Sequence, residues 1–183
     1  MRTQATTVDA AGAVRPVGDT PVFVHDFAPL DVAFADAFIA LTELLDHRTL
    51  AGIVATSWNS EVASDHLLHV DHHPCASADI DIRLGHYRER GDAVIVPLAW
   101  ESVAEWVSPL DADIELAAFG RWRSHLHIVG RSRLAPGTRT QTARAITEQR
   151  LAAAVVRRVI NAIADRLVLQ VGRTPNDALF PLV

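Results

Sequence analysis

The sequence contains no lysine, so its 17 basic side chains are all arginines, and with 22 acidic residues its formal net charge is −5. No run of arginines forms a basic patch, and an acidic chain is repelled by phosphate, so nucleic acid is not an expected partner. The single cysteine, Cys75, excludes an internal disulfide and a cysteine-based zinc site. No apolar run approaches the roughly 18 residues of a membrane span, and the N-terminus does not resemble a signal peptide. We therefore expect a cytoplasmic protein with no membrane span.

The composition is that of a globular chain, because 49% of the 183 residues are hydrophobic and 21% are charged. One domain is the default at this length. Residues 1–20 show no hydrophobic period and are expected to form a flexible tail. We expect the domain itself over residues 21–172, followed by a C-terminal tail over 173–183.

A stretch without proline or glycine, residues 138–171, predicts one long helix. Thr138 with Gln141 fits a capping box at its start, and Gly172 is a credible stop. At helical spacing the apolar side chains share one face and the polar side chains share the other, so another element has to cover the apolar face. The apolar face contains Ala145, Ala152, Val155, Val156, Val159, Ile163 and Leu167; the polar face contains Arg150, Arg157, Arg158, Asn161 and Asp165.

The first elements are predicted to be a strand and one or two helices. Residues 21–27 favour a strand that Pro29 ends, and Asp31 is expected to cap a helix running to about His47. Residues 49–57 indicate either a second short helix or a continuation of the first. From residue 59 to 77 the hydrophobic period is lost.

Four further segments have the period of two that is typical of half-buried strands: residues 79–86, 93–100, 113–119 and 124–134. The first two flank a turn over residues 89–92 and are expected to form a hairpin. Pro97 cannot donate a ladder hydrogen bond, so its strand should lie at an edge or be bulged there.

The alternation assigns each side chain of these strands to one of two faces. One face is apolar and should meet the long helix, whereas the opposite face is charged. His125 and His127 on the charged face are expected to be solvated partners of Asp113 and Glu115, if the last two strands pair. The apolar set is Ile80, Ile82, Leu84, His86, Val94, Val96, Leu98, Trp100, Ile114, Leu116, Ala118, Leu126, Ile128 and Gly130. The charged set is Asp79, Asp81, Arg83, Asp113, Glu115, His125, His127, Arg131 and Arg133.

This order of elements resembles the START-like (SRPBCC, helix-grip, Bet v 1-like) superfamily, and in particular bacterial proteins related to polyketide cyclases and dehydrases. The strands from residue 78 to 137 and the helix that follows carry the resemblance, which covers about half of the chain. It implies an α+β fold: a curved antiparallel sheet that grips a long C-terminal helix, with one or two short helices near the N-terminus. Only five clear strands are counted here, whereas the superfamily usually has more.

The resemblance also implies a cavity between the sheet and the helix. The small residues Ala145, Ala152 and Ala164 on the helix, and Gly130 and Ala118 on the sheet, would leave room for an apolar ligand. The alternative is that the layers approach closely and leave no space. The side chains expected to contact a ligand are Leu84, His86, Val96, Leu98, Trp100, Leu116, Leu126, Ile128, Ala152 and Val156.

Three functions remain open. The favoured one is binding of a small hydrophobic or amphipathic molecule. The second is an enzyme of cyclase or dehydratase type with His86 as acid or base, although a hydrogen-bonded core histidine is the commoner role for such a residue. The third is a non-catalytic self-association or interaction module, which leaves a homodimer open. The sequence assigns no catalytic residue, and no cofactor is expected.

A histidine cluster precedes the first strand of the hairpin. Such side chains can bind zinc, but exposed histidines in an irregular loop are commoner, so no metal site is predicted. Its His-His-Pro triplet is similar to that of pterin carbinolamine dehydratases, but the pattern downstream does not follow that family. The cluster consists of His66, His69, His72 and His73.

Overall fold

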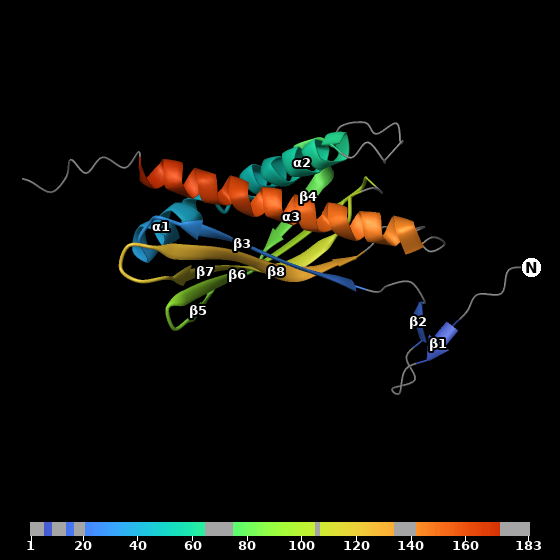
Figure 1. The fold of residues 1–183 in the computed structure, drawn as a ribbon, viewed down its shortest axis with the longest axis horizontal. Coiled ribbons are helices and arrows are strands. Elements are labelled where there is room, and N and C mark those ends of the chain that lie inside the picture. The colour runs from blue at the N-terminus through green and yellow to red at the C-terminus, as the bar shows by residue number, and fades with distance from the viewer. Residues whose placement is uncertain are drawn as a thin grey trace, which may run out of the picture.

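The computed structural model describes residues 6–8, 14–16, 21–64, 75–104, 107–133 and 142–172. A strand is followed by two helices, a series of antiparallel strands and a long C-terminal helix, which is the order expected of a helix-grip fold (Figure 1). The elements are β1 (Thr6–Val8), β2 (Val14–Pro16), β3 (Pro21–Leu30), α1 (Phe34–Leu44), α2 (His47–Ser64), the 3-10 turn η1 (Ser77–Asp79), β4 (Ile80–Leu84), β5 (Arg88–Arg90), β6 (Ala93–Ser102), β7 (Leu110–Ala118), β8 (Ser124–Arg133) and α3 (Thr142–Val171).

The main sheet has six strands in the order β3-β8-β7-β6-β4, with β5 also paired to β6, and every pairing is antiparallel. The hairpin predicted between residues 79–86 and 93–100 is confirmed, and the last two strands, β7 and β8, pair as well. Two features were not predicted: β5, and the small ribbon in which β1 pairs with β2 within residues 1–20.

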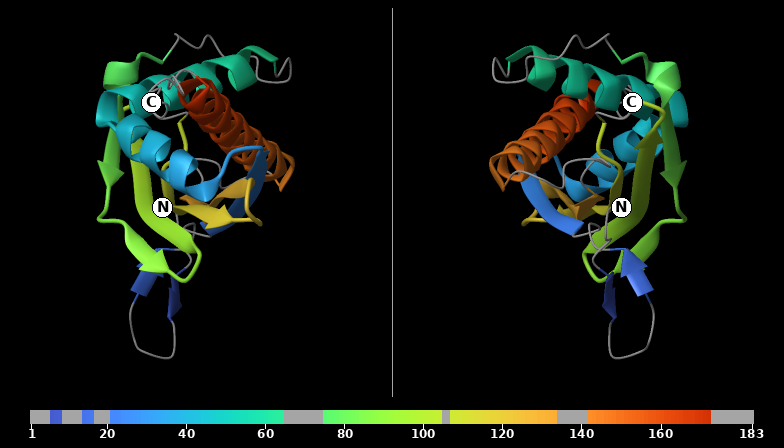
Figure 2. Two further views of the ribbon diagram at one scale, coloured as in Figure 1. Left: turned by 90° about the vertical axis from the view of Figure 1, so that its left-hand side faces the viewer. Right: turned by 90° about the vertical axis from the view of Figure 1, so that its right-hand side faces the viewer.

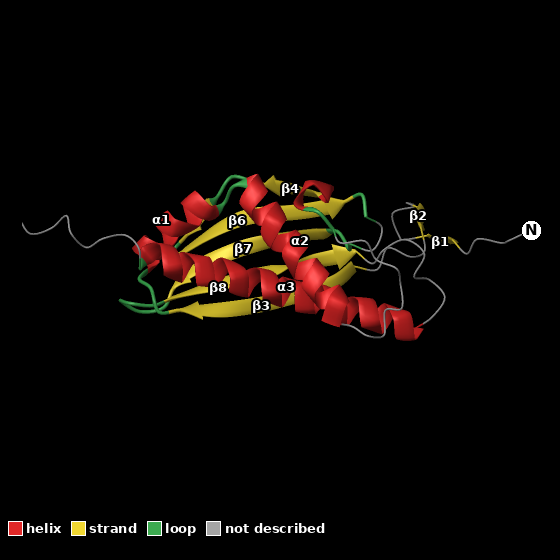
Figure 3. Ribbon diagram, turned by 90° about the horizontal axis from the view of Figure 1, so that it is seen from above, coloured by secondary structure: helices red, strands yellow, loops and turns green. Residues whose placement is uncertain are grey.

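All three helices lie on one face of the sheet (Figure 3), and the end-on views show the sheet curving around α3 (Figure 2). Helix α3 contacts β3 and β8, α2 contacts β4 and α3, and α1 contacts α3 and β7. The predicted α+β fold, a curved antiparallel sheet gripping a long C-terminal helix, is therefore confirmed.

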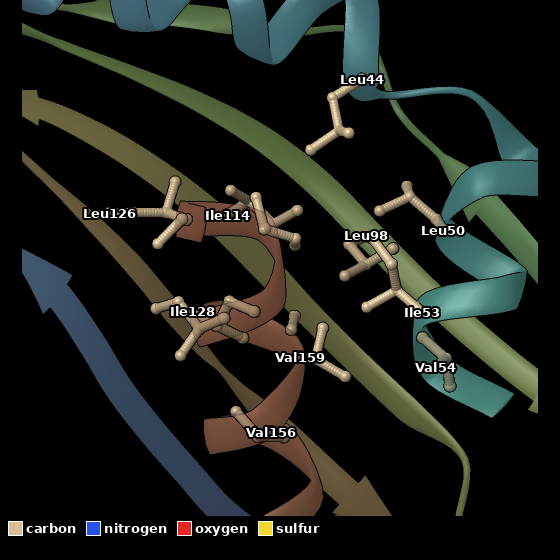
Figure 4. Packing of buried hydrophobic residues seen from close by; sticks show 14 of the residues in the cluster. Leu44, Leu50, Ile53, Val54, Leu98, Ile114, Leu126, Ile128, Val156 and Val159 are labelled. Atoms are coloured by element: carbon tan, nitrogen blue, oxygen red, sulfur yellow. The ribbon is translucent and has the colours of Figure 1, made fainter. Parts of the chain in front are cut away.

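Helix α3 presents the predicted apolar face to the sheet. The predicted face residues from Ala152 to Leu167 are buried, and Val155, Val159 and Ile163 have no exposed surface. Figure 4 shows Val156 and Val159 of this face within the buried cluster. Arg157 and Arg158 lie on the exposed side as expected, and they pair with Asp26 of β3 and Glu61 of α2. Gly172 follows the last helical residue, as predicted. The expected capping box of Thr138 and Gln141 lies outside the described residues.

The predicted end of the first strand is wrong. Strand β3 continues through Pro29 to Leu30, because an edge strand tolerates a residue that cannot donate to the ladder. Asp31 does not cap α1, whose N-cap is Ala33 without a side-chain hydrogen bond. The Asp31 carboxylate instead forms an exposed ion pair with Arg123, at 2.8 Å.

The choice left open for residues 49–57 is settled, since they belong to a second helix. Asp46 starts that helix by accepting the backbone N–H groups of Arg48 and Thr49 at 3.0 and 2.9 Å. Hydrogen bonds from the Thr49 side chain and backbone, and then from the Arg48 backbone, lower the pKa of Asp46. Because α2 reaches Ser64, the predicted loss of regular structure from residue 59 is wrong for 59–64.

The end of α2 is joined to the start of the sheet by one side chain. The Asn59 amide donates to the carbonyl of Cys75 and accepts the N–H of Cys75, both at 2.8 Å. Asp79 accepts the N–H of Ala76 at 3.0 Å, which shapes the turn that leads into β4. Two backbone groups of Cys75 are thus fixed to the helix by a single residue.

Candidate functional site

The interior between the sheet and the helices is the candidate site. Eight of the ten side chains predicted to contact a ligand are buried there, and Leu84 packs half-buried at the margin. Their burial confirms the predicted faces, whereas their contact with a ligand remains a prediction. The eight are Val96, Leu98, Trp100, Leu116, Leu126, Ile128, Ala152 and Val156.

The predicted position of His86 is wrong. Leu84 pairs with Leu98, and Arg88 pairs with Ile95. Three residues, 85–87, lie between these pairs on the first side of the ladder, but only two residues, 96–97, lie between them on β6. The extra residue is a β-bulge, which changes the phase of the alternation. His86 is consequently exposed and lies outside both strands rather than on the apolar face.

Pro97 accounts for the position of this bulge. Its carbonyl accepts the Gly85 N–H at 2.9 Å, so the proline nitrogen also faces the interrupted side of the ladder. A Cβ at position 85 would lie 2.8 Å from the Pro97 Cβ, so glycine permits this close approach. The prediction that Pro97 requires an edge or a bulge is confirmed.

Trp100 is buried, with 1% of its surface exposed, and its indole N–H donates to the carbonyl of Ser108 at 3.1 Å. It pairs across the ladder with Ile82. The hydrogen bond to Ser108 occupies the polar end of Trp100, which leaves the ring as an apolar part of the interior.

The small sheet residue Gly130 does not leave space for a ligand. A Cβ at Gly130 would lie 2.3 Å from the Cβ of Ala112 and 2.5 Å from the carbonyl oxygen of Asp111. Gly130 and Ala112 are directly paired on β8 and β7. The small residue is therefore required by the close approach of these strands.

Among the residues that the structure describes, no acidic or basic side chain is buried in this interior. The buried polar residues are the four serines Ser57, Ser108, Ser124 and Ser132. The hydroxyls of Ser57, Ser124 and Ser132 donate to backbone carbonyls. Cys75 is buried as well, and desolvation is the main reason that its pKa is raised, so the neutral thiol is favoured.

Aromatic side chains join α1 to the bulge at the rim of the interior. Phe34 and Phe38 stack one helical turn apart with ring centroids 6.2 Å apart, and Phe38 meets Tyr87 edge-on at 5.8 Å. Both phenylalanines are half-buried, whereas 55% of Tyr87 is exposed. Helix α1 therefore reaches across to the bulge through side-chain contacts rather than through backbone pairing.

The opposite face of the sheet holds the ionisable side chains. Glu115 lies directly across from His127, as expected, but Asp113 lies across from Val129 and pairs with Arg88 at 3.4 Å. His125 instead stacks on Phe119, with ring centroids 4.3 Å apart. Desolvation, together with the charges of His25 and His125, lowers the pKa of His127, while Glu115 acts in the opposite direction.

Sequence reasoning missed the exposed aromatic residues of this face. Phe23 and Phe27 on β3 are 72% and 54% exposed. The signal was the alternation of Phe23, His25 and Phe27 with Val22, Val24 and Asp26, but both sets contain apolar residues, so the pattern could not assign the faces.

The histidine cluster, His66, His69, His72 and His73, lies outside the described residues. Within the described part of the chain, no three histidine, cysteine or acidic residues are grouped as metal ligands. Over the same residues, no helix has the length and apolar character needed to cross a membrane.

Comparison with known proteins identifies similar folds only. No family model matches the sequence. No curated protein matches it either. The Zhui aromatase/cyclase from Streptomyces sp. R1128 is 11% identical with a TM-score of 0.42, and the match covers 84% of this chain and 95% of that one. The hypothetical protein jhp0584 from Helicobacter pylori is 10% identical with a TM-score of 0.38, over 93% of this chain and 99% of that one. At these scores neither similarity says anything about a ligand, so function has to be argued from this chain's own residues.

Proposed function

We propose that this protein binds a small hydrophobic or amphipathic molecule between the curved sheet and its three helices. The observation that carries the proposal is the character of that interior, where the described buried side chains are apolar except for four serines. Burial of apolar surface contributes about 25 cal/mol per Å², so such an interior suits a ligand held by shape and area.

The aromatic contacts of α1 suggest the route of entry. Helix α1 is joined to α2 by only two residues, Leu45 and Asp46, and it reaches the bulge through Phe38 and Tyr87. Displacement of α1 would separate those rings and expose the end of the apolar interior. In this proposal the ligand enters between α1 and residues 85–87.

The same interior argues against the catalytic alternative. General acid–base chemistry needs a titratable side chain within hydrogen-bond reach of the substrate. His86 is exposed, and none of the described acidic or basic residues is buried beside the apolar side chains. The geometry therefore supports binding better than a reaction that uses His86 as acid or base.

Two neighbouring alanines of α3 provide a matched test, because Ala152 is buried and Ala153 is exposed. The Ala152→Leu change adds bulk on the interior side, whereas Ala153→Leu adds the same atoms on the solvent side. We expect Ala152→Leu to weaken binding of the probe 1-anilinonaphthalene-8-sulfonate at least tenfold, with Ala153→Leu unchanged. Native mass spectrometry of the purified wild-type protein should reveal a co-purified small molecule that Ala152→Leu reduces. Absence of both bound molecule and probe binding in the folded wild type would contradict the proposal.

A further inference from the structure

The face of the sheet opposite the helices carries a regular pattern of side chains. We define the outer face by the outward-pointing residues of β3, β8, β7 and β6, which the ladder aligns in rows across the strands. No described helix lies on this face (Figure 1). The rows, in strand order, are Phe23–Arg131–Asp111–Ala99, His25–Val129–Asp113–Pro97 and Phe27–His127–Glu115–Ile95.

Within these three rows, each strand contributes mainly one kind of chemistry to the outer face. Strand β3 contributes exposed aromatic rings, and β8 contributes Arg131 and His127. Strand β7 contributes acidic side chains, including Asp111 and Glu115. Strand β6 contributes small or apolar side chains. The stripes are therefore aromatic, basic, acidic and apolar in that order.

A depression of about 390 Å³ interrupts the apolar stripe. Its lining includes Pro97 and Ala99, with Arg83, Glu101, Asp111 and Arg133 around them. Arg83 and Arg133 both reach Glu101, at 2.6 and 3.4 Å. The short side chains of Pro97 and Ala99 thus lie among longer charged ones.

We propose that two copies of this chain associate through their outer faces, about a two-fold axis that runs parallel to the strands between β7 and β8. Rotation about that axis reverses the order of the stripes. Positions along the strands do not change, so each row faces the same row of the partner subunit. Strand β7 then faces β8 of the partner subunit, and β3 faces β6 of the partner subunit. The same surface serves both copies, as a two-fold interface requires.

This arrangement is complementary in charge and in shape. Asp111 faces Arg131 of the partner subunit, and the two-fold axis repeats this pair, so opposite charges meet twice, while Glu115 faces the imidazole of His127 of the partner subunit. Phe23, which is 72% exposed, faces Ala99 of the partner subunit and can enter the depression there. An axis centred on β7 or on β8 would instead place like charges opposite one another.

The outer face is also large enough. Four strands about 4.8 Å apart, with ten residues rising about 3.3 Å each, cover roughly 600 Å² in projection. Two copies together therefore exceed the approximately 1,000 Å² that a specific interface needs. Exposed aromatic rings and arginine are the residue types that contribute most to such interfaces.

Sedimentation velocity over a concentration series tests the proposal with paired charge reversals. We expect the wild type to dimerise, and Asp111→Arg or Arg131→Asp alone to weaken dimerisation at least tenfold, because each places like charges opposite one another twice. An equimolar mixture of the two variants should recover most of the wild-type affinity. In the mixed dimer one contact keeps the native pair of Asp111 and Arg131, and at the other contact the two charges are exchanged, so both contacts join opposite charges. Asp165→Arg, an exposed reversal on α3, is the control that should change nothing.

A second variant keeps the test decisive if a charge reversal fails to fold. Phe23→Ser should weaken dimerisation at least tenfold, whereas Ile39→Ser, a similarly exposed apolar position on α1, should not. A wild type that stays monomeric at every concentration overturns the proposal. A dimer that is insensitive to Phe23→Ser, or a variant mixture that does not recover, overturns it as well, because association would then use another surface or another alignment.

Discussion

The two faces of the sheet are built from the same strands and yet have opposite properties. On β8, Leu126 and Ile128 point inward and have no exposed surface, while Val129 points outward and is 48% exposed. The described acidic and basic residues are absent from the buried set, and those on β6, β7 and β8 point to the outer face. The comparison teaches that the inner side of these strands offers shape and apolar area, whereas their interactions that depend on charge and pH belong to the outer face.

The largest effect should come from removing inward atoms. Leu126→Ala leaves a cavity in a fully buried position and should lower the free energy of unfolding by about 2–5 kcal/mol. Val129→Ala on the same strand should change it by about 0.5 kcal/mol or less. Urea unfolding followed by circular dichroism measures both, and similar losses from the two variants would remove the proposed distinction between the faces.

A smaller loss is expected where the strands approach most closely. Gly130→Ala places a Cβ against the Ala112 Cβ and the Asp111 carbonyl, so we expect a loss of about 1–3 kcal/mol from overpacking. Gly52→Ala in α2 is the matched control, because a Cβ there meets nothing within 4 Å and alanine favours a helix by about 1 kcal/mol. Thermal unfolding should therefore shift in opposite directions for the two changes.

The ion pairs of the outer face should contribute less to the free energy of unfolding than the Leu126→Ala or Gly130→Ala change removes. Arg83 and Glu101 form a 2.6 Å pair whose side chains are 59% and 46% exposed. Exposed pairs of this kind contribute about 0.2–1 kcal/mol. A double-mutant cycle with Arg83→Ala and Glu101→Ala, measured at low and high salt, should give a coupling free energy in that range that decreases with salt. A coupling several times larger would mean that the outer face is shielded from solvent.

The smallest effect concerns pH. Since desolvation, aided by His25 and His125, lowers the pKa of His127 despite the opposing charge of Glu115, the folded protein favours the neutral imidazole. This contribution to stability is fully present above the ordinary histidine pKa of about 6.5 and is lost as the pH falls through the lower folded value. His127→Gln should therefore lose less stability on acidification than the wild type.

Titration by NMR provides the direct measurement for His127. Its midpoint should lie below that of a histidine in an unfolded peptide, and Glu115→Gln should lower it further, because that change removes the charge that raises the pKa. A midpoint above the peptide value would contradict the desolvation argument.

Much of the fold could be predicted because the alternation in the strands and the helical period of residues 151–171 both depend on burial. The eight buried residues of the predicted ligand set follow from that pattern alone. The position of His86 could not be predicted, since one extra residue between Leu84 and Arg88 depends on Pro97 in the neighbouring strand. The aromatic outer face was missed because β3 has apolar residues in both phases.

The β-bulge at residues 85–87 also has a consequence for how the sequence can vary. When a strand gains or loses a single residue, every side chain beyond that point moves to the opposite face of the sheet. The bulge already contains one unmatched residue, and Gly85 and Tyr87 are held by contacts to Pro97 and Phe38 rather than by a continuous ladder. Among natural relatives of this chain, single-residue insertions and deletions within the β4–β5 strand should therefore be concentrated at these three positions.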